Sequence, residues 1–326
     1  MILLCGIPSE PPLAMVAAAA SGVADSVTLN QRDVLHSDLT LRLDNNGLSG
    51  WLGIGAEAWP LDAFTGIYVR LMDHRALPEI RNEPVDSPAR LHADRFHDAL
   101  YEWLEMTSAR VVNRLSSMAS NGSKPYQAGL VQRFGFDTPE TLVTSDPAQV
   151  GAFQRRFGDV VYKSISGVRS IVTTLKEDDV RLDRIRWCPV QFQERVAGTD
   201  VRVHVVGDEV FATRVRSTAT DYRYAGEQVG AMAVLEPLDL SAEVAARCVD
   251  MTAAMGLAFS GIDLRFAEDG RVICFEVNPS PGFSYFEANT GQPIASAVAA
   301  YLAGGADARS RSAHSQAGTE RPPGDL

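Results

Sequence analysis

The chain has few cysteines, and they lie far apart in the sequence. Cys5, Cys188, Cys248 and Cys274 are the only four among 326 residues, and no two of them form a Cys-x-x-Cys pair. This spacing argues against a cysteine-based zinc site and against the disulfide framework of a small secreted domain. We therefore expect the protein to work in a reducing compartment, the cytoplasm.

Long uninterrupted apolar segments are also lacking. No run approaches the roughly 20 apolar residues that a helix needs to cross a bilayer. The apolar start, residues 1–20, has no Lys or Arg before Arg32 and is interrupted by three prolines and Glu10, which is unlike a signal peptide. It predicts a buried strand, a loop and a helix in a protein that is not inserted in a membrane.

An excess of positive charge is missing as well. The 30 Lys and Arg residues face 41 Asp and Glu residues, a net charge of −11, which argues against nucleic acid as a partner. Local basic clusters can still bind a small polyanion. The chain contains no G-x-x-x-x-G-K-[ST] sequence, and the "GIG" at 53–55 lacks the third glycine of a dinucleotide fingerprint. Any nucleotide site must therefore be of another kind.

The sequence that is present predicts an α/β protein of three lobes and a tail. At 45% hydrophobic residues, the chain can bury more than one core. Residues 1–115 mix short strands with a long helical pattern that continues past residue 106. In the second lobe, "TPE" at 138–140 predicts a helix start. The expected segments are a first α/β lobe (1–115), a smaller central lobe (116–190), a strand-rich third lobe that ends in a helix (191–303) and a disordered tail (304–326).

Two acidic residues are predicted to face each other across a hairpin in the third lobe. Asp269 and Gly270, between alternating apolar residues, are typical of a two-residue turn. Counting back from this turn puts Asp263 opposite Glu276, with Asn278 further along the same face. Carboxylates and an amide oxygen suit Mg²⁺. A charged pair on a solvated face, with Asn278 starting the next turn, explains the pattern about as well.

Basic residues alternate along the preceding strands. A three-residue turn at 207–209 would bring Arg202 opposite Arg214, and the same register would put Asp200 opposite Arg216. Adjacent guanidinium groups repel each other unless an anion joins them, which favours a phosphate or carboxylate ligand. Surface charge at the edge of a sheet is the more frequent explanation when such a pair is considered alone. We expect the neighbouring His204 to be a structural or peripheral residue.

Two lysines lie next to loops of small residues. Lys163 ends "VVYK" and precedes "SISGVRS" (164–170), a loop whose backbone N–H groups would be able to cover phosphates. Lys124, in "NGSKPYQ", is either a turn lysine or a second phosphate ligand. Each of these signals is weak when taken alone.

Taken in order, these segments resemble the ATP-grasp superfamily, in the branch of carboxylate-amine ligases related to the ribosomal-protein glutamate ligase. The likeness covers about residues 113–303, and "GIDLRF", "FEVNPSPG" and "QFQERVAGTDVRVHVVGDEVFATRV" carry it. The first lobe and "FSYFEANTGQPIASAVAAYL" are similar to the microviridin-type, or graspetide, peptide ligases. The resemblance implies a three-lobed α/β ATP-grasp fold with ATP between the central and C-terminal lobes.

The resemblance also implies roles for single residues. Metal ligands would be Asp263, Glu276 and Asn278; adenine would contact the backbone of Gln193, Glu194 and Val196 and the side chains of Val161 and Phe275; ribose would contact Asp200; phosphates would contact Lys124 and Lys163; and the phosphate and acyl phosphate would contact Arg202, Arg214 and Arg223. Two departures from the family pattern are Arg195 in the hinge and the low glycine content of residues 164–170.

The implied activity is an ATP-dependent ligation. ATP with Mg²⁺, or with Mn²⁺ in its place, would phosphorylate a carboxylate, and an amine or hydroxyl would attack the acyl phosphate. The favoured substrate is a ribosomally made peptide, and a small-molecule carboxylate is the other. The alternatives are a ligase that adds an amino acid such as glutamate, a small-molecule kinase, and a degenerate peptide-binding or regulatory protein. A homodimer is left open.

Overall fold

The chain forms two compact units in a computed structural model that describes residues 1–45, 47–163, 173–175, 179–217 and 233–304. The first unit comprises Met1–Leu115, Val206–Asp208 and the segment from Pro293 onward. The second comprises Ser116–Val205 and Glu209–Gln292. None of the helices in the described ranges combines the length and the hydropathy that a transmembrane span requires.

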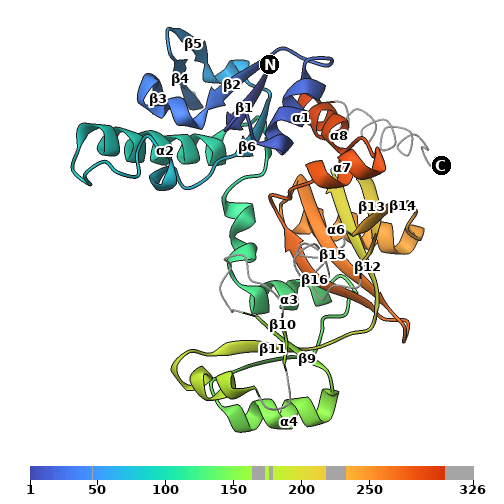
Figure 1. Cartoon of the computed structure of the whole chain (residues 1–326). Helices are drawn as coiled ribbons and strands as arrows, with labels where there is room; N and C mark the ends of the chain where they lie inside the picture. The colour runs from blue at the N-terminus through green and yellow to red at the C-terminus, as the bar shows by residue number, and fades with distance from the viewer. Residues whose placement is uncertain (46, 164–172, 176–178, 218–232, 305–326) are drawn as a thin grey trace, which may run out of the picture. The chain divides into compact units, whose positions relative to one another are not determined.

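The first unit contains a parallel four-stranded sheet in the order β2-β1-β6-β7 (Figure 1). All five residues of β1 are buried, as is usual for a central strand that is covered on both faces. This confirms the strand, loop and helix expected at residues 1–20. The elements of the sheet and its helices are β1 (Ile2–Gly6), α1 (Pro11–Ala20), β2 (Ser26–Asn30), β6 (Gly66–Arg70), α2 (Pro88–Met106), β7 (Arg110–Val112) and α8 (Ile294–Ala303).

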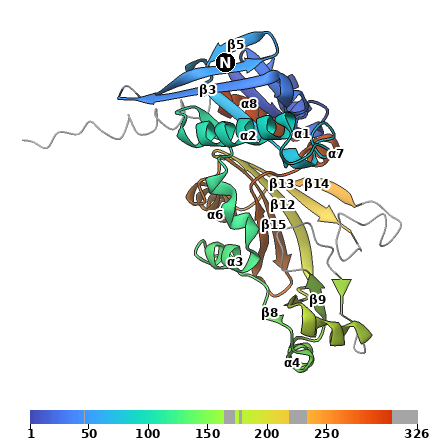
Figure 2. The same ribbon diagram turned by 90° about the vertical axis from the view of Figure 1, so that its left-hand side faces the viewer.

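A second, antiparallel sheet in the first unit has the order β3-β4-β5. Its strands are β3 (Ser37–Asp44), β4 (Gly47–Ile54) and β5 (Glu57–Pro60). Leu39 and Leu41 of β3 pack against the core that also contains Phe96 and Leu100 of α2. Helix α2 therefore runs alongside β3 and covers the apolar face of this small sheet (Figure 2).

Two expectations about the extent of the first lobe were wrong: where its long helix ends, and which helices belong to it. The long helix stops at Met106, because Arg110–Val112 forms strand β7 beside β6. The last helix, α8, was assigned to the third lobe but packs on α1, β6 and β7 of the first unit. The reason is close packing: a Cβ atom on Gly66 of β6 would lie 2.4 Å from the Leu302 carbonyl oxygen, so the glycine lets α8 approach the sheet.

The second unit contains two further sheets, of order β10-β9-β11-β8 and β14-β13-β12-β15-β16. The smaller sheet is covered by α4, and the larger one by α3 and α6. Its elements are α3 (Lys124–Gln132), β8 (Thr141–Thr144), α4 (Pro147–Phe157), β9 (Val160–Lys163), β10 (Thr173–Thr174), β11 (Val190–Glu194), β12 (Gly198–Val206), β13 (Glu209–Arg216), β14 (Val234–Leu238), α6 (Ala242–Ala254), β15 (Phe259–Ala267), β16 (Val272–Asn278) and α7 (Ser284–Thr290).

The helix start expected at residues 138–140 was wrong. Thr141–Thr144 forms strand β8, which pairs with β11, because its Thr-Leu-Val-Thr sequence is rich in β-branched residues. The helix starts later, where Asp146 accepts a hydrogen bond from the Ala148 N–H at 2.9 Å and Pro147 takes the first helical position. Of the expected tail, 304–326, only Gly304 is among the described residues.

His97 is held as a neutral side chain in the core of the first unit. Its Nδ1 donates to the Ala93 carbonyl at 2.8 Å, and its Nε2 accepts from the amide of Gln31 at 3.1 Å. The same Gln31 amide donates to the Met72 carbonyl. A proton on Nε2 of His97 would point at the Gln31 amide nitrogen, which is itself a hydrogen-bond donor. Burial lowers the pKa of His97 to about 4, although the Ala93 carbonyl acts in the opposite direction.

This arrangement predicts a pH-dependent stability. The folded pKa of His97 lies below the unfolded value of about 6.5, so the unfolded chain takes up the proton first. Stability should therefore be complete above pH 7 and fall between about pH 6.5 and pH 4, by roughly 2 kcal/mol at pH 5 from this residue alone. Urea unfolding of the wild type and of His97→Gln at pH 7 and pH 5 measures the difference. The exposed His36, replaced by Gln, is the control, and an equal pH effect in both variants would contradict the assignment.

Candidate active site

The large sheet of the second unit has one apolar and one polar face. Alternate residues of β12 and β15 belong to the core under α3 and α6: Val201, Val203, Val205, Ile262 and Leu264. Since side chains alternate along a strand, the residues between them lie on the other face. That polar face carries Asp200, Arg202, His204, Gly261, Asp263 and Arg265.

The structure confirms that Asp263 and Glu276 face each other, but the turn and the strand register that bring them together differ from those expected. The turn is one residue longer than expected, because Ala267 pairs with Arg271 and Gly270 has φ +89°. A β-bulge at Phe275 adds one residue to β16 and restores the register, so that Asp263 is the Cα partner of Glu276. Cys274 and Val277 are in the apolar core, so Phe275 and Glu276 are both directed to the polar face.

Arg202 neutralises one of these carboxylates. Its side chain is 7% exposed, and Nη1 donates to Oδ1 of Asp263 at 2.8 Å. The guanidinium lies over Gly261, where a Cβ atom would come within 2.1 Å of Arg202 Nη2. A side chain at position 261 would displace this arginine. Gly261 is thus the residue that allows a cation to cross from β12 to Asp263.

His204 supports Arg202 and is fully buried. The Arg202 Nε donates to His204 Nε2 at 3.4 Å, and the imidazole packs against Phe259 and Phe286. Burial and the neighbouring guanidinium of Arg202 hold the pKa of His204 well below its usual range. The ring is therefore neutral and acts as an acceptor, which is a structural role, the first of the two alternatives expected from the sequence.

The expected pair of Arg202 and Arg214 is wrong. Arg214 follows Ala212 by two residues in an unbroken ladder with β14, and Ala212 belongs to the apolar core with Val203. Arg214 is therefore on the face opposite Arg202. It forms an ion pair with Glu236 at 3.6 Å.

The turn explains this difference. Only Gly207 and Asp208 separate β12 from β13, and Gly207 takes a left-handed φ of +54°. A turn shorter by one residue moves every side chain of β13 to the other face. For the same reason Arg216 is near Glu236 at 3.1 Å rather than near Asp200. Arg223 lies outside the described residues.

Asp200 is instead held by Arg265, which the sequence analysis did not single out. Two hydrogen bonds of 2.8 Å join the guanidinium of Arg265 to both carboxylate oxygens of Asp200. The same guanidinium lies 5.2 Å from the centroid of the Phe275 ring. Arg265 follows Asp263 by two residues on one strand, so the alternation of β15 was a signal for it. These three side chains form one continuous polar and aromatic patch.

The hinge between β11 and β12 is anchored on both sides. Arg265 Nη1 donates to the Val196 carbonyl at 2.7 Å, and Glu194 forms an ion pair with Arg271 at 3.1 Å. Arg195 pairs with Asp159, which immediately precedes β9. Among the described residues, none accepts a hydrogen bond from the Val196 N–H. The Val196 N–H is thus a backbone donor that no described residue uses.

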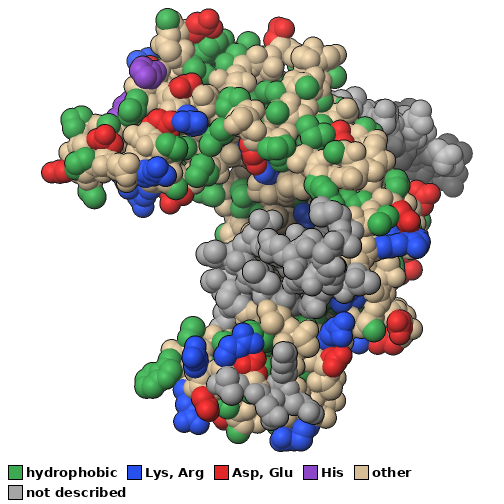
Figure 3. Space-filling view, in the orientation of Figure 1, with side chains coloured by type: hydrophobic (Ala, Val, Ile, Leu, Met, Phe, Trp, Pro, Cys, Tyr) green, Lys and Arg blue, Asp and Glu red, His purple; other side chains and the backbone are tan. Residues whose placement is uncertain are grey.

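The smaller sheet contributes Lys163 and Val161. Val160 and Phe192 are in the core with α4, so Val161 and Lys163 lie on the opposite face, where Gln193 is the register partner of Val161. The loop at 164–170 lies outside the described residues. The lobe with α4 is rich in arginine, and basic side chains are visible over it in Figure 3. Its sequence contains Arg155, Arg156, Arg181, Arg184 and Arg186.

Gln127 is a structural residue of the site that the sequence analysis missed. Its amide donates to the Val277 carbonyl at 2.8 Å and accepts from the Val277 N–H at 2.9 Å. This fixes α3 to the outer edge of β16, between the positions of Glu276 and Asn278. Lys124 precedes Gln127 by three residues and so shares its helix face. The i, i+3 spacing of the two polar residues was the available signal.

The three candidate metal ligands form a donor set that matches Mg²⁺. Asp263 and Glu276 are directly opposed, and Asn278 is two residues further along β16, where its Oδ1 accepts from the Ser280 N–H at 2.9 Å. Two carboxylates and an amide oxygen are hard oxygen ligands. Within the described ranges, no group of three or more His, Cys, Asp or Glu side chains is suited to a metal, so a two-carboxylate set is the candidate.

The Gln127 contact predicts a loss of stability on substitution. Gln127→Ala leaves the buried N–H and C=O of Val277 without partners, which should lower the free energy of unfolding by about 2–3 kcal/mol. Gln132→Ala is the matched control, because Gln132 is on the same helix and its side-chain amide donates to Thr138 at the surface. Chemical denaturation of both variants is the measurement. If the two lose the same stability, Gln127 does not fix α3 to β16.

The family model described as "RimK-like ATP-grasp domain" matches residues 122–302 of this chain. Among curated proteins, a "probable alpha-L-glutamate ligase" of Sodalis glossinidius is 30% identical over 216 residues, 63% of this chain and 72% of that protein. The protein of the same description from Shewanella loihica is 26% identical over 215 residues, 63% of this chain and 70% of that protein.

Solved structures of similar fold match nearly the whole chain. The RiPP-associated ATP-grasp ligase of Chryseobacterium gregarium, in complex with ADP and a leader and core peptide, has a TM-score of 0.76 at 20% identity, covering 92% of this chain and 96% of that one. The ATP-grasp ligase PsnB, complexed with a minimal precursor, has a TM-score of 0.73 at 25% identity, covering 94% and 98%. The family match extends over more than half of the chain, on the unit that carries Asp263 and Glu276. The chain therefore belongs to the RimK-like ATP-grasp family of ATP-dependent ligases.

Proposed function

We propose that this ligase activates a side-chain carboxylate of a ribosomally made peptide as an acyl phosphate. An amine or hydroxyl of the same peptide then attacks it, and an amide or ester, ADP and phosphate are formed. The observation that carries this proposal is the structural likeness to a peptide ligase. The peptide-bound PsnB ligase matches 94% of the chain with a TM-score of 0.73 at 25% identity, whereas a D-alanyl-alanine synthetase of Vibrio cholerae, which covers 92% of the chain, has a TM-score of 0.56.

The proposed ATP site uses both sheets of the second unit. The Val196 N–H would bind the adenine edge beside Gln193 and Glu194, and Val161 and Phe275 would pack on the ring. Asp200, oriented by Arg265, would bind the ribose hydroxyls. Lys163 and Lys124 would attract the phosphates, because an ammonium group can contact several oxygens of a polyphosphate.

Asp263, Glu276 and Asn278 would hold Mg²⁺, which would offset phosphate charge when bound; Mn²⁺ accepts the same oxygen ligands. Arg202, fixed beside Asp263 by Gly261 and His204, would bind the transferring phosphoryl group or the acyl phosphate. A guanidinium that is already oriented stabilises the developing charge without a further cost of reorganisation. The proposal leaves out Arg214, which lies on the other face.

A second candidate function is the addition of an amino acid such as glutamate to a protein or small molecule. The curated relatives favour it, since the Sodalis glossinidius protein of that description is 30% identical. Both candidates use the same ATP chemistry and differ in the acceptor. We also infer a cytoplasmic location, where ATP is present and the four free cysteines remain reduced.

Glu276→Gln should stop ADP formation without unfolding the protein. The substitution removes one anionic ligand, and it also relieves the repulsion between two directly opposed carboxylates. Thermal stability without ATP should hold or rise. Asp263→Asn should stop ADP formation too, but it should lower stability, because the buried Arg202 loses its partner. Coupled detection of ADP and thermal unfolding measure both effects. Turnover near the wild-type rate in Glu276→Gln would disprove the metal assignment.

The substrate assignment is tested by the mass of the product. The enzyme is incubated with Mg²⁺, ATP and a candidate precursor peptide, and the peptide is followed by mass spectrometry. Internal cross-linking removes the mass of one water per bond, which is the expected result. A gain of one amino-acid residue, with glutamate present, would support the second candidate. A gain of one phosphoryl group would show a kinase and overturn the ligase assignment for this substrate.

A further inference from the structure

The two central strands of the parallel sheet in the first unit, β1 and β6, mark the point where the order of the strands reverses. The chain leaves β1 through α1 and returns as β2 on one side. It leaves β6 through α2 and returns as β7 on the other side. Ligands of open α/β sheets bind outside the carboxyl ends of the strands at such a reversal. The ends of β1 and β6 are therefore the place to look for polar groups that no other part of the protein uses.

One face of this end of the sheet belongs to α1. Ile67 packs in the core that contains α2, so Tyr68, and Arg70 two residues later, lie on opposite faces from it. Arg70 is the register partner of Gly6, the last residue of β1. A Cβ atom on Gly6 would come within 2.8 Å of the Arg70 carbonyl oxygen and 3.2 Å of Cδ2 of Leu13 in α1. The glycine thus lets the start of α1 and the end of β6 approach each other.

Glu10 holds the guanidinium of Arg70 at this end of the sheet. The Arg70 Nε donates to both carboxylate oxygens of Glu10 at 3.1 Å, and Nη2 also donates to Oε1. The side chain of Arg70 is only 10% exposed. Glu10 directly precedes α1, but its side chain does not cap the helix. Arg70 is therefore a cation whose orientation is fixed before any ligand binds.

Tyr68 places a hydrogen-bond donor beside this ion pair. The residue is 1% exposed, and its hydroxyl has no hydrogen-bond partner in the described part of the chain. Burial raises the pKa of Tyr68, the charge of Glu10 acts in the same direction, and that of Arg70 acts against both, so the hydroxyl is near the two charges. Arg70 has donors only and cannot accept the hydroxyl proton. Because buried polar groups are usually satisfied, the hydroxyl points to a bound acceptor.

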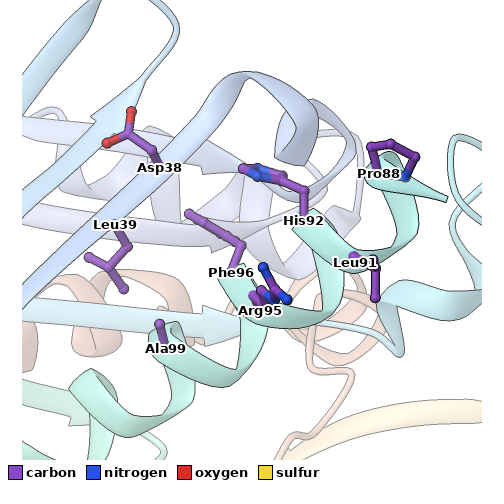
Figure 4. Close-up of a pocket in the computed structure, with 8 residues that line it drawn as sticks. All are labelled: Asp38, Leu39, Pro88, Leu91, His92, Arg95, Phe96 and Ala99. Atoms are coloured by element: carbon purple, nitrogen blue, oxygen red, sulfur yellow. The ribbon is translucent and has the colours of Figure 1, made fainter. Parts of the chain in front are cut away.

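A second cavity of the first unit does not combine these groups. It has a volume of about 490 Å³ and lies between β3 and α2, where Leu39, Leu91 and Phe96 give it a largely apolar lining (Figure 4). Its arginine, Arg95, is exposed, and Asp38 lines the same cavity. A carboxylate bound there would meet a like charge. Of the two places, the end of β6 is the one that suits an anion.

We infer that Tyr68 and Arg70 bind a carboxylate of the substrate, supplied by an acidic side chain of the peptide. Both groups donate hydrogen bonds, and a planar guanidinium matches the two oxygens of a carboxylate. An amide in that place would offer one oxygen and set its own N–H groups against these donors. The site therefore distinguishes an acidic side chain from its amide. That the carboxylate comes from a peptide rests on the proposed function, and a free amino acid is the other source of the same group.

Binding of small probes to the full chain, followed by ligand-observed NMR titration without ATP, tests the site. N-acetyl-L-glutamic acid α-amide carries only a side-chain carboxylate and represents the peptide, and free L-glutamate represents the amino acid. N-acetyl-L-glutamine amide is the neutral control of the same shape. The expected result is that the wild type binds the acidic peptide probe, binds free glutamate no better and binds the neutral probe more weakly.

Tyr68→Phe removes only the hydroxyl, and it should weaken binding of the acidic peptide probe about tenfold, because a hydrogen bond to a charged acceptor is lost. Thermal stability should hold or rise, since the hydroxyl has no partner among the described residues. Arg70→Lys keeps a cation beside Glu10 but loses the planar fork, and should weaken binding by about tenfold or more. Tyr101→Phe, on α2 of the same unit, is the matched control and should bind as the wild type does.

A wild type that binds neither acidic probe, or that binds the neutral probe equally well, would overturn the inference. So would a Tyr68→Phe variant that binds like the wild type or that is clearly less stable, because the hydroxyl would then have no ligand or a structural partner. Preference for free glutamate would overturn the peptide as the source. The readout needs no turnover, so the two proposals fail separately. Probe binding without any change in peptide mass would keep the carboxylate site and contradict the proposed function, and cross-linking without probe binding would do the reverse.

Discussion

The polar face of the large sheet depends on one buried cation, the guanidinium of Arg202. A buried charge is costly unless a partner compensates it, and Asp263 provides that partner. The same contact makes the opposition of Asp263 and Glu276 tolerable, because one of the two carboxylates is already neutralised. The neutral His204 and the bare backbone of Gly261 then serve to hold this guanidinium in place. Strands β12, β15 and β16 thus each contribute a charged side chain to this site: Arg202, Asp263 and Glu276.

Local signals in the sequence were sufficient for much of this arrangement. Alternation placed Asp200, Arg202 and His204 on one face, and turn residues located the hairpin of β15 and β16. The pairing of Asp263 with Glu276 was predicted correctly although the turn was not, because the longer turn and the bulge at Phe275 offset each other. A bulge has no reliable mark in a single sequence.

The wrong predictions of side-chain position share a physical cause. An error of one residue in a turn changes the register of the whole strand that follows it. One residue fewer in the turn at Gly207 moved Arg214 to the opposite face. Other features depended on partners distant in the chain. Gln127 and Arg265 acquire their roles only when α3 reaches β16 and β15 lies beside β12. The extent of the first unit could not be predicted for the same reason, since α8 follows the whole second unit in the sequence.

The discontinuity of the first unit affects how the protein is made on the ribosome. Its β-strands are synthesised first, but the apolar faces of α1 and β6 that α8 covers stay exposed until residues 294–303 have been translated. The second unit, which is nearly continuous in the chain, is complete before that point. We therefore expect the second unit to fold during synthesis and the first unit to complete its core last. A chaperone would then act mainly on the N-terminal sheet.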